Sequence, residues 1–356
     1  MPPSTRIPAL LQPYVQLPND SILLLTSTLG ASANWLLIRF LRNELNTQDG
    51  GDEGHNVVLV SWMREYDFWK QEARKGAALD LDKLRREGRF AFVDGLGAGG
   101  NATDSTAERP LRTDAQATPR VPVSNATPQR GPQILPARGP PGRIVPARGP
   151  PPAAPAAPAA MPATTTANGP TNATQSTSGH YTLKSLEIVD IKSTISSAIS
   201  PLATSTARKT LLIFDNPDLL LALNPAITTS HFTTLMLQLH TLPNVSHILT
   251  HLQADNPLLS LSTPPQPLEV AHHNLVVKCA HMSRRILGVR VLDTGVARDV
   301  SGVIRITEQR KQWFDVGFGI EANKEGDDSG RGKEFLYQVK SDGSVRVFER
   351  GAGGEG

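Results

Sequence analysis

The stretch "SILLLTSTLGASANWLLIRFL", residues 21–41, indicates the fold class of this chain. Its "ILLL" part is a short apolar run between polar residues, which is typical of a strand buried on both faces. After a turn of small residues, apolar residues recur at helical spacing from 33 to 45, opposite Arg39, Arg42 and Asn43. A buried strand, a glycine-containing turn and a helix form the local pattern of a phosphate-binding loop.

The turn nevertheless lacks the residue that such a loop needs most. A phosphate-binding loop surrounds the β-phosphate with backbone N–H groups, and adds a lysine for the phosphate charge and a hydroxyl for Mg²⁺. Placing Gly30 at the second glycine puts Ala31 at the lysine position and Ser32 at the hydroxyl position. The first lysine of the chain is Lys70, so no other alignment supplies one. We therefore expect a nucleotide-binding fold with a degenerate loop and no bound cofactor.

The rest of the pattern predicts an α/β fold. Further buried strands are expected at 56–62, 89–96, 209–215 and 245–252, separated by helices that include 64–79, 181–200 and 230–242. The stretch 269–282 fits either a helix or a strand. Strands that alternate with helices pair in parallel through right-handed crossovers. Four strands between 284 and 351, the last two joined by "SDG", should extend this sheet in antiparallel fashion. The prediction is a RecA-like, mostly parallel sheet flanked by helices.

Residues 99–180 interrupt this pattern. They are rich in Ala, Pro, Thr, Gly and Ser, and "PARGPP" occurs at 136 and again at 146. Such a composition buries too little apolar area to offset its ordering entropy, so we expect a disordered insertion with polyproline II character. Neither the segment before residue 99 nor the segment after residue 180 contains a complete sheet by itself. The predicted organisation is a RecA-like domain split into 1–98 and 181–350, with a flexible tail at 351–356.

Composition limits the class of protein. The net charge is +3, and between 101 and 180 seven arginines face Asp104, Glu108 and Asp114, which leaves the folded part close to neutral. A uniformly basic nucleic-acid binder is not indicated, whereas a basic arm is. The single cysteine, Cys279, excludes an internal disulfide, and we find neither a signal peptide nor a membrane span. We expect a soluble intracellular protein of the cytoplasm, with the nucleus as an alternative.

Two carboxylates end predicted strands, where α/β folds place ligands. Asp215 follows four apolar residues, as the acid of a Walker B motif does, and Asp94 ends the third strand in the same way. The alternative is that any such strand ends in a polar residue. Without the lysine, neither carboxylate argues strongly for Mg²⁺ and we expect no metal site. Ser61 and Asp67 have no evident base partner, so no catalytic nucleophile is expected either.

The histidines give no metal-binding pattern. His247 and His251 are four residues apart but lie in a predicted strand, which separates them by about 13 Å. A second group has no spacing known for zinc sites; its members are His272, His273, Cys279 and His281. We expect packing or surface roles for these side chains.

The segment "REYDFW" is the densest aromatic and basic group of the chain. Arg64, Tyr66 and Trp69 are candidates for stacking on RNA bases or for contacts with a partner protein. The alternative is that the aromatic rings anchor a helix to the sheet.

Several segments resemble the Elongator complex protein 6 family. The resemblance rests on "VVLVSWMREYDFWKQEARKGAALDLDKLRREGRFAFVDGL" (57–96), on the small-residue turn at 26–32 and on "LLIFDNPDLLLAL" (211–223). It continues in the tail, through "VLDTGVARDVSGVIRITE" and "FLYQVKSDGSVRVFERG". It therefore covers most of the folded part, but not the insertion or 310–332.

This resemblance implies a RecA-like subunit without Walker motifs, in agreement with the missing lysine. Such a subunit assembles with Elongator complex proteins 4 and 5, two copies of each, into a six-membered ring. The ring belongs to Elongator, which modifies the wobble uridine of tRNA, and it binds tRNA and is thought to release it in response to ATP. The chain would be a structural and tRNA-binding subunit rather than an enzyme, with no membrane partner.

Two other functions are alternatives at this point. A RecA-type ATPase would need a cation from elsewhere to replace the missing lysine. An adaptor would use its "PARGPP" repeats to recruit polyproline-binding domains.

Overall fold

The computed structural model describes residues 7–45, 54–97, 179–205, 208–295, 297–309 and 332–349. These residues belong to one compact unit formed by 1–105 and 175–356. The predicted insertion lies outside the described residues, apart from Gly179 and His180, and His180 already begins a strand. The predicted tail at 351–356 also lies outside them.

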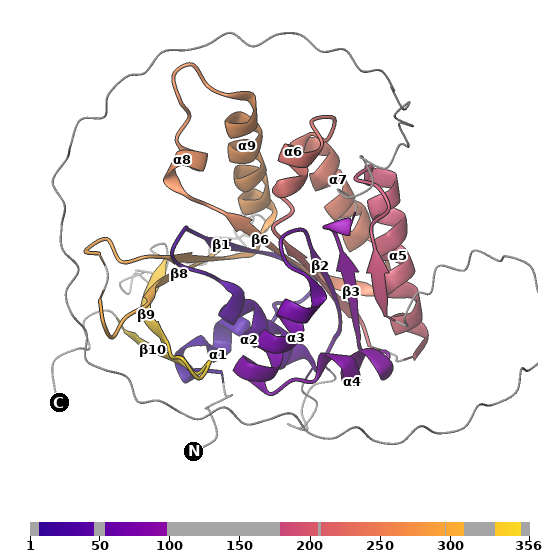
Figure 1. Cartoon of the computed structure of the whole chain (residues 1–356), viewed down its shortest axis with the longest axis horizontal. Helices are drawn as coiled ribbons and strands as arrows, with labels where there is room; N and C mark the ends of the chain where they lie inside the picture. The colour runs from indigo at the N-terminus through magenta and orange to yellow at the C-terminus, as the bar shows by residue number, and fades with distance from the viewer. Residues whose placement is uncertain are drawn as a thin grey trace, which may run out of the picture. The chain divides into compact units, whose positions relative to one another are not determined.

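The described residues form one ten-stranded sheet in the order β10-β9-β8-β7-β1-β6-β5-β2-β3-β4 (Figure 1). The strands are β1 (Ser21–Ser27), β2 (Asn56–Ser61), β3 (Phe90–Asp94), β4 (His180–Thr182), β5 (Thr210–Asp215), β6 (Val245–Gln253), β7 (Arg285–Arg290), β8 (Gly302–Glu308), β9 (Lys333–Val339) and β10 (Val345–Glu349).

Strand direction confirms the predicted fold class. All pairs from β7 through β1, β6, β5, β2 and β3 to β4 are parallel, and β8, β9 and β10 extend the sheet in antiparallel pairs. One detail differs from the prediction: β7, the first of the four C-terminal strands, pairs in parallel with β1. The preceding helix α9 (Pro267–Met282) returns the chain to the start of the sheet, so β7 must run in the direction of β1.

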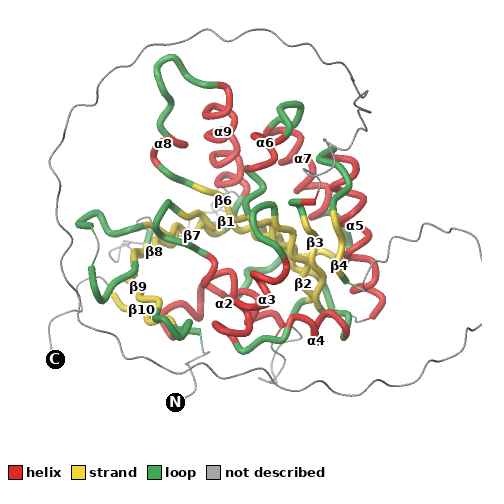
Figure 2. Tube along the Cα trace, in the orientation of Figure 1, coloured by secondary structure: helices red, strands yellow, loops and turns green. Residues whose placement is uncertain are grey.

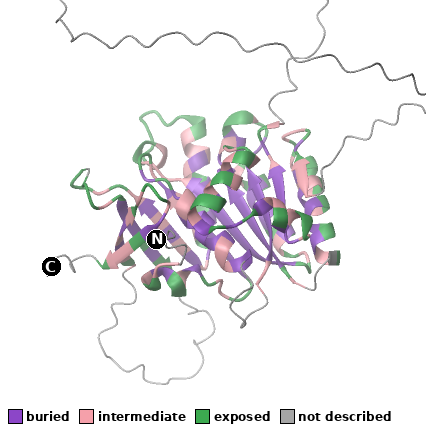
Figure 3. Ribbon diagram, turned by 60° about the horizontal axis from the view of Figure 1, so that its bottom comes forward, coloured by how far each residue is buried: buried purple, intermediate pink, exposed green. Residues whose placement is uncertain are grey.

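Helices cover both faces of the parallel part (Figure 2). One face packs against α2 (Asn34–Leu45), α3 (Tyr66–Ala77) and α4 (Leu81–Arg86), and the other against α5 (Ile188–Ser205), α7 (Thr229–His240) and α9. Alternate residues of each central strand enter the two cores: Leu23 and Leu25 the first, Ile22 and Leu24 the second. Burial on both faces explains why these strands read as continuous apolar runs (Figure 3).

Capping and strand pairing explain two features of the helices, one that the sequence pattern left open and one that it predicted differently. The ambiguous stretch 269–282 is helical because Pro267 stands at the first turn and Gln266 forms a capping box with Glu269. The predicted helix at 181–200 begins later, at Ile188, because Tyr181 belongs to β4 and pairs there with Val93 of β3. The remaining helices are short: η1 (Ala9–Leu11), α1 (Gln12–Val15), α6 (Leu219–Leu223) and α8 (Asn256–Leu259).

A buried arginine ties the C-terminal hairpin to the helices. Arg39 of α2 donates from Nη1 to the carbonyl of Gly76, at the end of α3, and from Nη2 to the carbonyl of Gly343, 3.2 Å away. Burial, with a smaller effect of Arg42, lowers the pKa of Arg39 to about 10. The guanidinium stays charged at neutral pH and complements the negative end of α3.

Within the described ranges, no helix is both long and apolar enough to cross a membrane.

We expect Phe214→Ala to destabilise the chain by about 3–5 kcal/mol. Phe214 is fully buried in β5, with its ring 6.1 Å from Trp62 and 5.9 Å from Phe232 between centroids. Urea unfolding measures the change. The exposed Val189→Ala serves as control, and a loss below about 1 kcal/mol at Phe214 would contradict this packing.

Candidate functional site: the carboxyl edge of the sheet

The parallel strands end at one edge of the sheet, where α/β folds bind ligands. Strand register places Ser61 of β2 opposite Asp215 of β5, and Asp215 opposite His251 of β6. Ser27, the last residue of β1, pairs with Gln253 two residues beyond His251. These five polar residues come from four strands, and they meet beside the loop that resembles a phosphate-binding loop.

The carboxylate of Asp215 is neutralised inside the protein. Ser61 Oγ donates to its Oδ2 over 2.8 Å, and His251 Nδ1 lies 2.9 Å from its Oδ1. Arg64 Nη1 lies 3.8 Å from Oδ2. The residue is 0% exposed, so the carboxylate faces these partners and no solvent. A buried carboxylate needs such compensation.

His251 links Asp215 to β1. Because the carboxylate can only accept, the proton between the two side chains belongs to His251 Nδ1. The other ring nitrogen, Nε2, lies 2.8 Å from Ser27 Oγ, which is also 3.2 Å from Oε1 of Gln253. The result is a continuous polar network across β2, β5, β6 and β1.

The order Ser27–His251–Asp215 has the connectivity of a nucleophile, base and orienting acid. Its members are at most 2% exposed, so no substrate reaches the Ser27 hydroxyl. The N–H of Thr28, which follows the serine, is bonded to the carbonyl of Val289. A hydrolase needs an accessible nucleophile, and the hydroxyl of Ser27 is buried in this structure. The arrangement is a structural network.

The degenerate loop is a tight turn instead of a phosphate cradle. The N–H of Ala31 donates to the carbonyl of Thr28 over 2.9 Å, and Gly30 has a φ of +86°. The N–H of Leu29 donates to Asp255 Oδ1 over 2.6 Å, and Ser32 Oγ accepts from the N–H of Asn34. Three backbone donors of the loop, the N–H groups of Leu29, Ala31 and Asn34, are thus bonded within the chain.

The side chains of the loop also fail to fit a magnesium nucleotide. Ala31, at the lysine position, is 1% exposed and packs in the core under α2, so even a lysine there would not face a ligand. The carboxylate of Asp255 stands where a phosphate would approach and repels it. Asp215, the Walker B counterpart, already has three partners. At the described positions of the lysine and of the Walker B acid, the side chains therefore pack or bond within the chain.

The three "REYDFW" candidates occupy different environments. Arg64 reaches the site, and its guanidinium also lies 5.0 Å from the ring centre of Phe68. Tyr66 donates from its hydroxyl to Asp82 Oδ1 over 2.8 Å, and burial, followed by this bond, raises its pKa. Trp69 is fully buried in the core between α3 and the sheet. The indole thus has the position of an anchoring side chain and presents no face to solvent.

Of the other predicted candidates, Asp94 lies next to the network, because it is the β3 partner of Ser61 in the strand register. Asp94 accepts from the N–H of Leu96 in its own turn. His247 lies nearer the opposite end of β6, and Cys279 is buried on α9, where burial raises its pKa to about 12. Within the described part of the chain, no group of three or more His, Cys, Asp and Glu side chains is arranged to hold a metal ion.

A second buried acid stands beside the network. Asp218 Oδ2 lies 3.8 Å from His272 Nδ1, and the Nε2 of this histidine bonds the carbonyl of Gln253. Burial raises the pKa of Asp218 although His272 opposes that shift. Sequence reasoning missed both Asp–His pairs, because their partners are 36 and 54 residues apart. The order of β5 and β6 brings Asp215 to His251, and the packing of α9 beside α6 brings His272 to Asp218.

Two shallow cavities of the described residues lie elsewhere. One, of about 500 Å³, is bordered by Tyr14 and Phe335; the other, of about 270 Å³, separates Val189 of α5 from Leu235 of α7. Neither is lined by Asp215 or by the loop.

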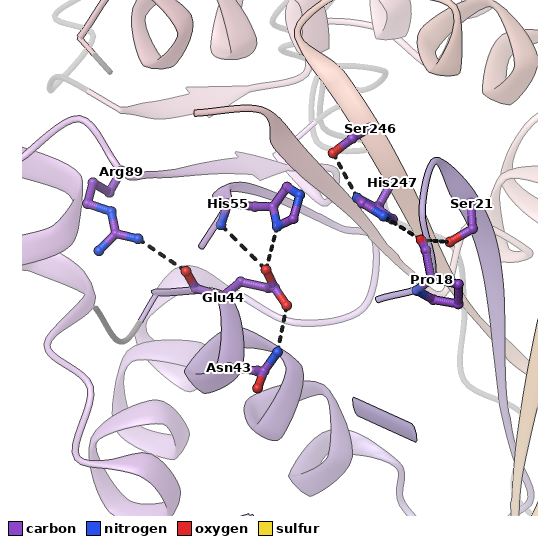
Figure 4. A network of polar contacts seen from close by, with 8 residues as sticks. All are labelled: Pro18, Ser21, Asn43, Glu44, His55, Arg89, Ser246 and His247. Carbon is purple, nitrogen blue, oxygen red and sulfur yellow. Dashed lines mark hydrogen bonds and ion pairs between the residues drawn. The ribbon is translucent and has the colours of Figure 1, made fainter. Parts of the chain in front are cut away.

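A different polar network occupies the amino ends of the strands (Figure 4). His55 Nδ1 lies 2.6 Å from Glu44 Oε2, and the rings of His55 and His247 meet edge to face at 4.7 Å between centroids. His247 Nε2 lies 2.7 Å from the carbonyl of Pro18, to which it must donate. Burial is the main cause that lowers the pKa of His247, so the neutral ring is favoured.

Comparisons with known proteins leave the family open. No protein-family model matches the chain, and no curated protein matches it either. Among solved structures, a KaiC-like protein from the hyperthermophilic archaeon Pyrococcus horikoshii OT3 matches 98% of this chain and 99% of its own. The TM-score is 0.48 and the identity 11%. This likeness is too low to support a conclusion, and the RecA-like description rests on the strand order and direction of the chain itself.

We expect Asp215→Asn to lower the free energy of unfolding by about 3 kcal/mol, because it leaves Arg64 and His251 facing a neutral group. Chemical denaturation measures the change, with the half-buried Asp94→Asn as matched control. If Asp215 instead served as a magnesium ligand, the substitution would alter nucleotide binding and leave stability within about 1 kcal/mol.

His247 should make the folded state less stable in mild acid. Its folded pKa is below the ordinary 6.5, so below pH 6.5 the unfolded chain binds more protons. Stability contributed by His247 is therefore lost as pH falls from about 6.5 towards the folded pKa. Relative to wild type, His247→Gln should therefore lose less stability between pH 7.5 and 5.5. Equal losses in both proteins would contradict this assignment.

Proposed function

We propose that this chain is a non-catalytic RecA-like subunit of the hexameric Elongator subcomplex that binds tRNA during wobble-uridine modification. The observation that supports this proposal best is the closed carboxyl edge. Asp215 has internal partners, Ala31 is buried at the lysine position, and Asp255 occupies a loop donor. A chain that keeps the sheet but fills the nucleotide position with its own side chains is suited to assembly rather than to hydrolysis.

The same edge argues against the alternative of an active RecA-type ATPase. Such an enzyme needs a cation on the β- and γ-phosphates and a carboxylate free to orient Mg²⁺ or water. Arg64, the cation that lies nearest to Asp215 in the network, stacks on Phe68 and is directed at that carboxylate. It would have to leave both partners to reach a phosphate.

For tRNA, cations away from this edge are better placed. Lys75 packs against Gly343 in the β9–β10 turn, and both Arg74 and Lys75 are exposed at the end of α3. Lys340 precedes the same turn. Lysine and arginine side chains on one surface attract the phosphate backbone without reading its sequence. We propose this surface as the contribution of the chain to tRNA binding.

Native mass spectrometry of the tagged chain, purified gently from its own cells, tests the proposal. We expect a six-chain assembly that contains Elongator complex proteins 4 and 5, two copies each of three related polypeptides, and that carries tRNA. The bound RNA is identified by sequencing after release.

Removal of the cations provides the matched control. The triple variant Arg74→Ala, Lys75→Ala, Lys340→Ala should keep the six-chain assembly. The slope of the logarithm of the tRNA binding constant against the logarithm of the salt concentration should become shallower, by about one unit for each removed cation that contacts a phosphate. A monomeric wild-type chain, or one bound only to proteins unrelated to RecA-like folds, would overturn the proposed function.

A further inference from the structure

Among the described residues, the carboxyl edge of the sheet has exposed apolar side chains. Leu29 follows β1 and Val291 follows β7, and both are exposed. Met63 after β2 and Leu96 after β3 form a second exposed pair on the same edge. Parallel strands end together, so these loops share one side of the sheet. Contiguous apolar side chains with a polar rim mark contact surfaces.

Leu29 is the most exposed of these side chains and stands on a rigid support. It is 86% exposed at the tip of the Thr28–Ala31 turn. Gly30 fixes the turn, because a side chain there would come within 3.2 Å of Val291 Cγ1 and its φ of +86° disfavours other residues. The bond from the Leu29 N–H to Asp255 fastens the backbone beneath the side chain. An exposed leucine on a preorganised turn loses little conformational freedom when it enters a pocket.

The charge at this edge is negative. In the described loops that follow β1, β2, β3, β6 and β7, together with the end residues of these strands, five acids face three arginines. The acids are Glu65, Asp94, Asp255, Asp293 and Asp299, and the arginines are Arg64, Arg290, which pairs with Asp293, and Arg298. Arg64 is directed at the buried Asp215, so it does little to offset the exposed acids. A phosphate or an RNA backbone would be repelled from Leu29, whereas a lysine or arginine would be attracted to Asp255.

We infer that Leu29, Val291 and Asp255 dock a neighbouring RecA-like chain, which presents an apolar pocket for Leu29 with an arginine or lysine beside it. This inference rests on the proposed ring function and names the chemistry of one contact within it. Asp255 can hold the Leu29 N–H and still accept from a partner cation, since a carboxylate has several acceptor positions. The position that a nucleotide would occupy thus becomes a protein–protein contact.

Substitutions at the exposed tip test the contact without disturbing the core. Leu29→Arg should reduce the six-chain assembly at least tenfold in native mass spectra, whereas Leu29→Met should assemble as wild type does. Val189→Arg, on the exposed first turn of α5, is the matched control for adding a surface cation. Unchanged thermal unfolding of Leu29→Arg shows that lost assembly is not lost folding. Full assembly of Leu29→Arg would overturn the inference and leave the proposed function standing.

Asp255→Asn removes the negative charge but keeps the turn, because the amide oxygen can still accept from the Leu29 N–H. We expect assembly several-fold weaker than in wild type at low salt, with the difference shrinking as salt screens the ion pair. Equal assembly of Asp255→Asn and wild type at every salt concentration would exclude a partner cation at this position.

Crosslinking identifies the occupant even if no ring is recovered. The photoreactive residue p-benzoylphenylalanine replaces Leu29 in the full chain in its own cells, with Val189 replaced as the control. A crosslink from position 29 to a RecA-like chain, in a peptide that carries a lysine or arginine near apolar residues, supports the inference. Only a RecA-like chain other than this one counts as support, so a crosslink to RNA, to a second copy of this chain or to no polypeptide overturns it.

Discussion

A buried carboxylate at the end of β5 is the constraint on which the carboxyl edge of this protein depends. Asp215 has no contact with water, so its charge must be balanced by groups that the fold brings to it. Ser61, His251 and Arg64 do so from β2, from β6 and from the loop that leads into α3. Three elements are thereby joined through one side chain, and the central strands are held in register where an enzyme would keep an open pocket.

In the neighbouring loop, groups that could contact a ligand also bond within the chain. In an active phosphate-binding loop, backbone N–H groups remain available for the ligand. Here Asp255 accepts from one, the turn closes on another, and Ala31 packs into the core. These groups are bonded or packed within the chain, and Leu29 is an exposed apolar side chain on a fixed turn. The acidic residues around it favour a protein partner with a positive charge over any phosphate.

Much of this architecture follows from local patterns. Apolar runs such as "ILLL" and "LLIFD" predict strands buried on both faces, and each is one. The absence of a lysine before position 70 already indicates a degenerate loop. The aromatic group at 64–69 was open to two interpretations, and burial places Trp69 in the core. His251 was expected to have a packing role, yet its partners Asp215 and Ser27 could not be named beforehand.

The sequence by itself determined most of the alternation of strands and helices and the missing lysine, because these depend on residue type and short-range spacing. Only the tertiary structure decided which strands are neighbours. The order β1-β6-β5-β2 is not contiguous in the chain, so the contacts of Ser27 with His251, and of Leu29 with Asp255, join residues more than 220 positions apart. Long-range pairing of this kind arises from the packing of whole elements, which no local pattern encodes.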